Sequence, residues 1–158
     1  MKLAPTLEGG LRIDADAVED WMVLDAICAD AAGMPGESLY DRLSEKMMRD
    51  DDWEEFVAPD IRDQFSDQVI HVSRALSGAS RNEEQEGVVF ISKEDAPIWY
   101  GAINQARMTL EHAYQLSELE EFAEIDELGH LSDEKLSAVV RGHFYSTFQS
   151  LLLEYVLD

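Results

Sequence analysis

The sequence predicts a mainly α fold, in which a single-domain bundle of five to six helices carries a minimal two-stranded sheet. Apolar side chains recur every three or four residues over most of the chain, which is the spacing of one helix face. Strand-like runs occur at about 11–14 and 88–91. A length of 158 residues suits one domain, so we expect residues 11–158 to form it and residues 1–10 to be a flexible lead-in.

The predicted helices follow from their apolar spacing and from the residues that start and stop them. Asp14 and Asp16 can each cap a helix N-terminus, and Gly33 with Pro35 ends the same helix. Ser132 can cap the last helix. The main helices are expected at 16–32, 37–49, 59–78, 93–115 and 132–157, with short helices at 52–57 and 117–129.

Two of these helices have apolar faces that we expect to line the core. The inner face of the first is expected to carry Val18, Trp21, Met22 and Cys28. On the last helix the expected inner stripe consists of Leu136, Val140, His143, Phe144, Thr147, Leu151 and Tyr155. His143 is therefore interpreted as a hydrogen-bonded core histidine.

The two predicted strands have the same local context. Ile13 and Trp21 recur as Ile91 and Trp99 at a constant offset of 78 residues, so in both places a short strand leads into a helix anchored by Trp. Internal duplication is one explanation. Because a lone strand would leave its backbone groups unsatisfied, we expect the two strands to pair with each other.

The charge of the chain excludes several classes of partner. Asp and Glu total 34 against 12 Lys and Arg, which gives a formal net charge of −22. Such a surface repels phosphate backbones and anionic lipids, so we expect neither nucleic-acid nor membrane binding. It favours a basic protein partner, or a host with a salty cytoplasm, since only 4 of the 12 basic residues are Lys.

Cysteine use and hydropathy indicate a cytoplasmic protein. Cys28 is the single cysteine, so an intrachain disulfide is excluded and a reducing compartment fits best. No apolar run approaches the roughly 18 residues that span a bilayer. The first residues also lack the apolar region of a signal peptide.

No complete catalytic or cofactor-binding motif is present. The glycine-rich phosphate loops and the nucleophile elbow of hydrolases are missing. Glu127 and His130 have the i, i+3 spacing found in di-metal bundles, but such a site needs two of these pairs. We therefore expect no metal, no cofactor and no catalytic residues.

A polar cluster on the helix expected at 93–115 is the best candidate for a ligand site. Asn104, Arg107 and Glu111 share one side of this helix, with His112 beside them, and the other side is apolar. Arg is scarce in this chain, so Arg107 is expected to form a structural ion pair or to clamp a neighbouring helix. The alternative is a site for a small anion or a peptide carboxylate.

Two further segments are candidates for partner binding. The densest acidic patch includes Glu118, Glu120, Glu121 and Glu124. It is either a solvated face or a docking surface for a basic partner. The C-terminal segment is apolar nearly all round and includes Leu153, Val156 and Leu157. Such a helix is buried in a bundle or forms a homodimer surface, and the sequence leaves both open.

One stretch resembles a known family. The run Trp-x-x-x-Ile-Asn-x-x-Arg-x-x-Leu, from Trp99 to Leu110, is similar to the most recognisable part of the bacterial domain-of-unknown-function family number two thousand and seventeen. Its members are small, acidic and helical, with an acidic, aromatic middle like residues 51–56 and an apolar last helix like residues 144–157. The resemblance implies no established activity. Some members are encoded near the adaptor of the Clp protease, which implies a link to proteostasis.

Together these features predict an acidic, soluble, non-enzymatic interaction or regulatory protein, linked to proteostasis through the resemblance. The alternative is an enzyme or a small-ligand-binding protein with a site around Asn104, Arg107 and Glu111.

Overall fold

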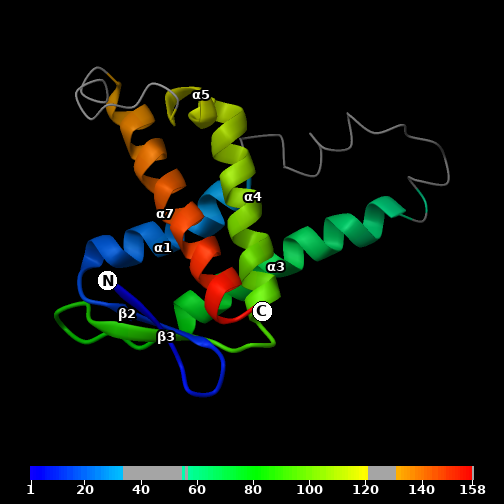
Figure 1. The fold of residues 1–158 in the computed structure, drawn as a ribbon. Helices are drawn as coiled ribbons and strands as arrows, with labels where there is room; N and C mark the ends of the chain where they lie inside the picture. Colours follow the sequence, from blue (N-terminus) through cyan, green and yellow to red (C-terminus); the bar gives the residue numbers. More distant parts are fainter. Residues whose placement is uncertain (34–54, 56, 121–130, 158) are drawn as a thin grey trace.

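The computed structural model describes residues 1–33, 55, 57–120 and 131–157. Its elements are β1 (Lys2–Pro5), β2 (Leu11–Ala15), α1 (Val18–Ala31), α3 (Ala58–Gly78), β3 (Gly87–Ile91), α4 (Ala96–Tyr114), α5 (Leu116–Glu120) and α7 (Asp133–Tyr155). The fold is mainly helical with a small antiparallel sheet, as the sequence predicts (Figure 1). The helix expected at 37–49 lies outside the described residues, as do most of those expected at 52–57 and 117–129.

The sheet has three strands in the order β1-β2-β3, one more than the sequence predicts. β2 is central and pairs antiparallel with both neighbours. The predicted pairing of segments 11–14 and 88–91 is confirmed, with Ile13 opposite Val89. The expectation of a flexible lead-in over residues 1–10 is wrong for Lys2–Pro5, which forms β1.

A tight turn brings the first residues into the sheet. Gly9 has φ +88°, which favours glycine, and the Thr6 N–H donates to the Gly10 carbonyl at 2.9 Å. The Gly10 N–H donates to the Thr6 hydroxyl at 3.0 Å. A Cβ on Gly10 would lie 2.3 Å from the carbonyl oxygen of Ile91, so this position has room only for glycine. The glycine pair therefore closes a hairpin between β1 and β2.

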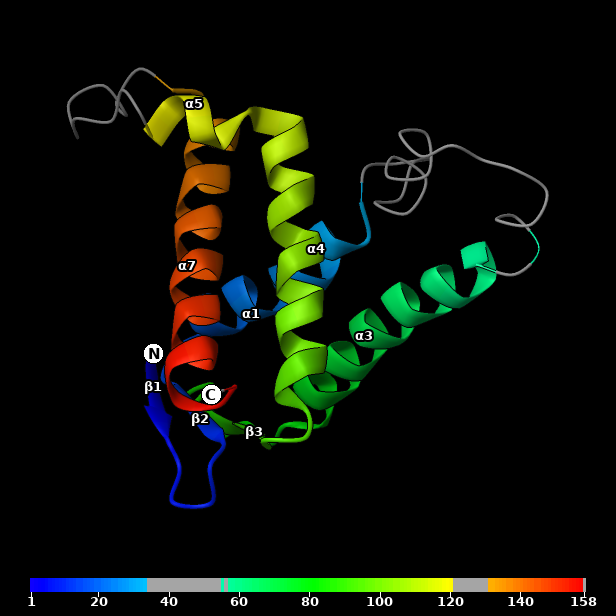
Figure 2. The same cartoon turned by 45° about the vertical axis from the view of Figure 1, so that its right-hand side comes forward.

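The core lies between one face of the sheet and helices α1, α4 and α7. Leu11 and Ile91 on that face are at most 1% exposed. α4 and α7 run side by side in opposite directions, and α1 crosses them (Figures 1 and 2). Trp99 of α4 stacks on Phe148 of α7 with ring centroids 6.1 Å apart. Large aromatic side chains buried in this way contribute heavily to folding stability.

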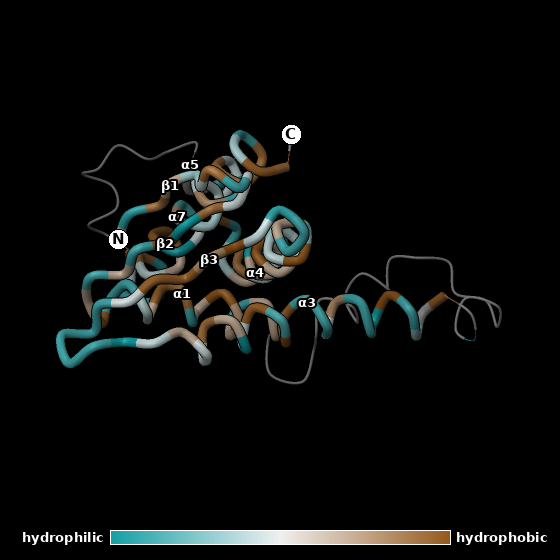
Figure 3. The backbone as a smooth tube through the Cα atoms, turned by 90° about the horizontal axis from the view of Figure 1, so that it is seen from below, coloured by the Kyte–Doolittle hydropathy of each residue, from teal (hydrophilic) through white to brown (hydrophobic). Residues whose placement is uncertain are grey.

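α3 packs against this core through its second half. Val72 and Leu76 are buried there. The buried amide of Gln105 on α4 donates to the Phe65 carbonyl at 3.1 Å and to the Gln68 side chain at 2.9 Å. The first turns of α3 extend past the other described elements (Figure 3). The helix is thus anchored at its C-terminal end.

Trp21 of α1 fixes the loop that precedes β3. Its indole N–H donates to the Gln85 carbonyl at 2.7 Å, and the Arg81 guanidinium carbon lies 3.9 Å from the ring centroid. Gln85 has φ +65°, a left-handed conformation that is uncommon outside glycine. The bond from Trp21 helps to hold this costly conformation in place.

The inner face of α1 differs from the predicted one. Trp21 is buried as expected, together with Leu24 and Ile27. Val18 and Met22, however, are 48% and 66% exposed, so their prediction as core residues is wrong. Apolar residues occupy several sides of α1, and periodicity alone therefore does not decide which side faces the core.

The same correction applies to α7. Its buried residues are Ala138, Tyr145, Phe148, Gln149 and Leu152. Leu136 and Val140 are 37% and 59% exposed. His143 and Thr147 are also exposed, so the prediction of a core histidine is wrong. The helix exists as predicted and is capped by Ser132, but it is rotated relative to the expected stripe.

Candidate functional site

An open apolar groove lies between α1 and α7, and we call it the α1–α7 groove. Its volume is about 670 Å³. Met22, Val23 and Ala26 line it from α1, and Leu136 and Val140 line it from α7. Met22 and Val140 are 66% and 59% exposed, so large apolar side chains face solvent on both walls. Clustered exposure of this kind is typical of interaction sites, whereas single exposed apolar residues are ordinary.

A charged junction joins the two helices at one end of the groove. The Arg141 Nε donates to Asp30 Oδ2 at 2.9 Å, and the Tyr145 hydroxyl donates to the same oxygen at 2.6 Å. Arg141 Nη1 also donates to the Ser137 hydroxyl at 2.5 Å. The side chains of Asp30 and Arg141 are only 15% and 22% exposed. Each charge therefore depends on the other for compensation.

The junction changes the proton affinity of its members. Burial, and then the hydrogen bond to Asp30, raise the pKa of the Tyr145 hydroxyl above its usual value. Burial alone would lower the pKa of Arg141, but the hydrogen bond to Asp30 and the Asp30 charge outweigh it and raise that pKa. Both groups thus keep their protons at neutral pH.

Two carboxylates of the groove lining lie away from the junction, one on each helix. Glu19 precedes Met22 by one turn on α1, and Asp133 precedes Leu136 by one turn on α7. Both carboxylates belong to exposed residues. Because α1 and α7 cross, these carboxylates lie on separate arms of the groove that diverge from the Asp30–Arg141 pair (Figures 1 and 2).

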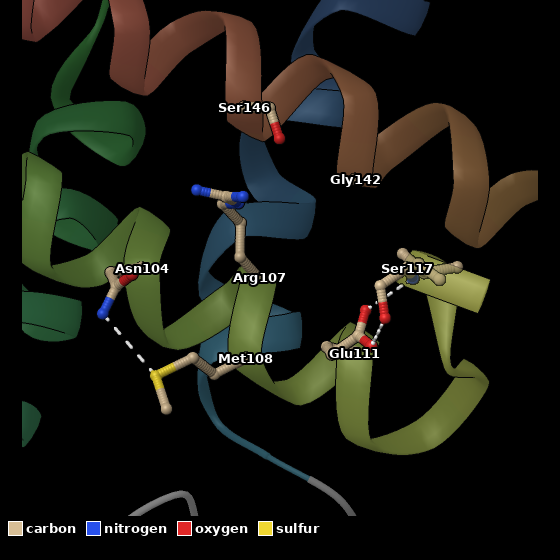
Figure 4. Close-up of a pocket in the computed structure, with 8 residues that line it drawn as sticks. Asn104, Arg107, Met108, Glu111, Ser117, Gly142 and Ser146 are labelled. Atoms are coloured by element: carbon tan, nitrogen blue, oxygen red, sulfur yellow. Dashed lines mark hydrogen bonds between the residues drawn. The ribbon is translucent and has the colours of Figure 1, made fainter. Parts of the chain in front are cut away.

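The residues predicted as a ligand site line a second pocket, which we call the Arg107 pocket. Asn104, Arg107 and Glu111 of α4 meet Ser117 of α5 and Ser146 of α7 around a volume of about 420 Å³ (Figure 4). The structure thus brings the three predicted residues together.

A left-handed residue shapes one end of the Arg107 pocket. Gln115 has φ +49° and ends α4, so the chain turns sharply into α5 and places Leu116 and Ser117 at the pocket. Leu116 also lies close to Gly142 of α7. A Cβ added to Gly142 would lie only 2.8 Å from Cδ1 of Leu116. The close approach of α5 to α7 closes this side.

Arg107 clamps α4 to α7. Its Nη1 donates to Oε1 of Gln149 at 2.5 Å, and Nε2 of Gln149 donates to the Tyr100 carbonyl at 3.3 Å. Gln149 is 3% exposed, so Arg107 satisfies an acceptor that water does not reach. This is the clamp on a neighbouring helix that the sequence predicts as one alternative. His112 is exposed and does not line the pocket.

Glu111 has a different partner from the one that its spacing suggests. Its carboxylate accepts the Ser117 N–H at 2.9 Å and the Ser117 hydroxyl. Within the described part of the chain, Glu111 and Arg107 form no ion pair. Asn104 donates weakly to the Met108 sulfur at 3.6 Å, as Figure 4 shows. The polar groups of the Arg107 pocket are therefore mostly satisfied by other groups of the protein.

The C-terminal residues predicted for partner binding divide between core and surface. Val156 is 3% exposed and Leu157 is half-buried against the core. Leu153 is 50% exposed. Burial in the fold, one of the two alternatives for this segment, thus applies to Val156, whereas Leu153 stays available at the surface.

The predicted acidic patch falls largely beyond what the structure describes. Glu118 is exposed on α5. Glu120 ends α5, and Glu121 and Glu124 lie outside the described residues. Glu127 and His130 also lie outside them. Among the described residues, no group of three His, Cys, Asp or Glu side chains could hold a metal ion.

Apolar spacing predicts Met22, Leu136 and Val140 as core residues, so the α1–α7 groove does not follow from the sequence pattern. The signal for it lies in the apolar residues on several sides of α1 and α7, because such helices are either fully buried or bind a partner. None of the helices in the described ranges is long and apolar enough to cross a membrane.

Fold and groove together define a small, acidic, mainly helical protein with an open apolar groove between two crossing helices. Residues 2–156 match the model of the family described as "Domain of unknown function (DUF2017)", and the chain belongs to this family. The resemblance predicted from Trp99 to Leu110 is thereby confirmed. Comparison with curated proteins and with solved structures gave no match.

Proposed function

We propose that this protein is a non-enzymatic interaction protein that binds a partner protein through the α1–α7 groove. The observation that carries the proposal is the position of Met22, Leu136 and Val140, which come from two helices and line one groove while 66%, 37% and 59% exposed. A partner that covers them gains about 25 cal/mol for each Å² of apolar surface removed from water.

The polar groups beside the groove support docking rather than chemistry. Asp30, Arg141 and Tyr145 satisfy one another, and the raised pKa values of Arg141 and Tyr145 keep both protonated. Proton transfer in catalysis favours a group whose pKa lies near the working pH. The junction therefore acts as a support that fixes the two walls of the groove.

Site-specific photocrosslinking in cells tests the proposal. A benzophenone amino acid replaces Val140 in the groove, and in a control it replaces Phe90, which is 65% exposed on β3 and lies outside the groove lining. We expect a discrete adduct from position 140 that disappears on Met22→Gln, and no such adduct from position 90. The same adduct from both positions, or none from position 140, contradicts the proposal.

The identity of the adduct tests two finer parts of the proposal. A component of Clp-dependent degradation as the crosslinked protein supports the link to proteostasis that the family resemblance implies. An adduct between two copies of this chain instead indicates a homodimer.

A small-ligand site in the Arg107 pocket is the second candidate function. It is supported by the convergence of Asn104, Arg107 and Glu111 on one pocket of about 420 Å³. A thermal-shift screen with small carboxylates compares the wild type with Arg107→Lys, because Lys cannot reproduce the planar fork of Arg. A stabilising ligand whose effect is lost in Arg107→Lys supports the site. If Arg107→Met is less stable and no carboxylate stabilises the wild type, Arg107 acts only as a clamp between α4 and α7.

A further inference from the structure

We infer that the partner segment in the α1–α7 groove is an amphipathic helix whose apolar stripe is flanked by Lys or Arg. This inference rests on the proposed function, since it specifies the occupant of the same groove. Two properties of the groove carry it, namely its helical walls and the placement of its charges.

The walls of the groove suit a helix better than a strand. Both walls are helices, whose interior backbone groups already bond to each other, so an extended peptide would gain no ladder hydrogen bonds there. Along α1 the lining runs from Glu19 to Asp30, which corresponds to about 16 Å. Along α7 it runs from Asp133 to Arg141, or about 12 Å. Side chains at i, i+4 and i+7 of a docked helix cover about 10 Å, so a helix that follows either wall fits within the length of that wall.

The charges of the groove select a basic partner. Three acidic residues and one basic residue line it, and the basic one, Arg141, is occupied by Asp30. No ion pair of Glu19 or Asp133 is present in the part of the chain that the structure describes. Each wall therefore carries one carboxylate without an ion-pair partner, at its end away from Arg141.

Each wall repeats the same local pattern. Glu19 and Met22 are three residues apart on α1, and Asp133 and Leu136 are three residues apart on α7, so each carboxylate lies beside an apolar side chain. A Lys or Arg on the partner can lay its methylene stem on Met22 or Leu136 and extend its charged end to the neighbouring carboxylate. This pattern fits basic residues on both sides of an apolar stripe.

Charge also disfavours a second copy of this chain as the occupant. Each copy has a net charge of −22 and only 12 basic residues. Docking one copy into the groove of another would bring two strongly negative chains together, which costs free energy and slows association. A basic segment of a different protein avoids this repulsion.

Three synthetic peptides of about four helical turns provide the test. The first carries Leu at i, i+4 and i+7 with Lys on both flanks of the stripe. The second has Glu in place of Lys, and the third has the composition of the first in scrambled order. Each is titrated into the full chain at physiological ionic strength, with fluorescence anisotropy for affinity and the methyl NMR signal of Met22 for location. We expect the Lys peptide to bind and shift that signal, and the other two to bind at least tenfold more weakly.

Paired charge variants separate local recognition from general attraction to an acidic protein. Glu19→Gln with Asp133→Asn is expected to weaken Lys-peptide binding about three- to tenfold, since each exposed charge pair contributes modestly. The matched control is Asp63→Asn with Asp67→Asn, which removes the same charge from exposed positions on α3 outside the groove lining. The control is expected to change the affinity by less than about twofold.

The outcomes distinguish this inference from the proposed function. Equal losses in the two double variants, or equal binding of the Lys and Glu peptides, overturn the basic partner and leave the groove as a docking site. Failure of all three peptides despite a Met22-dependent crosslink from position 140 overturns the amphipathic helix alone. A dimer in light scattering that becomes a monomer on Val140→Gln identifies a second copy as the occupant and overturns the inference. Absence of both peptide binding and crosslink overturns the proposed function as well.

Discussion

The two sides of α1 carry similar residues but have opposite roles. Trp21, Leu24 and Ile27 on the inner side are at most 1% exposed, whereas Met22 on the outer side is 66% exposed. The inner side packs against α3 and α4, and the outer side faces the open groove with α7. Whether an apolar residue is buried or exposed is therefore decided by the neighbouring element rather than by the residue itself.

The largest expected effect is a difference in the free energy of unfolding between two side-chain truncations on α1. Leu24→Ala, at a fully buried position, should lower the free energy of unfolding by about 2–5 kcal/mol. Met22→Ala, two residues earlier and exposed, should change it by less than about 0.5 kcal/mol. Urea denaturation of both variants measures the difference. Equal losses would mean that Met22 is part of the core.

The next effect concerns the junction between α1 and α7. Asp30→Asn removes the charge that compensates Arg141 and should lower the free energy of unfolding by about 1–3 kcal/mol, reduced from the fully buried case by partial exposure. Asp25→Asn, an exposed position on the same helix, serves as the control and should be nearly neutral. If both variants unfold at the same urea concentration, the junction does not stabilise the groove walls.

Arg107 allows a comparable test between α4 and α7. Arg107→Met leaves the buried Oε1 of Gln149 without its donor and should cost about 1–2 kcal/mol. Replacing both residues, as Arg107→Met with Gln149→Leu, removes the unpaired acceptor and should recover part of this loss. The clamp would be contradicted if the double variant lost more unfolding free energy than the two single variants lose together.

Stability at high pH reports on Tyr145. Its pKa is raised in the folded protein, so above about pH 10 the unfolded state releases a proton that the folded state retains. Unfolding then becomes more favourable as the pH rises, by at most about 1.4 kcal/mol per pH unit. Tyr145→Phe should flatten this part of the pH profile, measured by urea denaturation from pH 8 to 11. An unchanged slope in Tyr145→Phe would assign the loss to other groups.

The smallest effect is chemical and concerns Cys28. Burial, with the Asp25 charge as a second cause, raises the pKa of its thiol to about 11 from 9.0. At pH 8 its thiolate fraction should be on the order of a hundredfold lower than that of an ordinary cysteine, so a disulfide reagent should react slowly. Reaction as fast as in the urea-unfolded chain would contradict the half-buried position of this side chain.

The sequence predicted those parts of the fold that depend on local patterns. Helices α1, α3, α4 and α7 follow from apolar spacing, and the pairing of β2 with β3 follows from the need to satisfy backbone groups. β1 was not predicted because a strand of four residues is too short to show a clear apolar–polar alternation. Gly9 and Gly10, which lie between two short strand-like segments, are nevertheless a hairpin signal. The rotation of α1 and α7 about their axes depends on neighbours that periodicity does not specify.

The distinction between local sequence patterns and long-range packing also applies to the Arg107 pocket and the α1–α7 groove. Asn104, Arg107 and Glu111 could be grouped from sequence because they are close along one helix. The Gln149 partner of Arg107 lies 42 residues away, and the Asp30–Arg141 pair that supports the groove joins residues 111 apart. Contacts at such separations follow from the packing of whole helices, so neither the clamp partner nor the groove could be read from spacing.

The attachment of Trp21 to the loop before β3 gives the molecule a natural optical probe. Indole emission responds to the polarity around the ring and to its hydrogen bonding, and this ring bonds to Gln85 beneath the guanidinium of Arg81. Because Trp21 is adjacent to Met22 in the chain, any shift of α1 caused by an occupant of the groove would be transmitted to the chromophore. Docking could then be followed spectroscopically without attaching a dye.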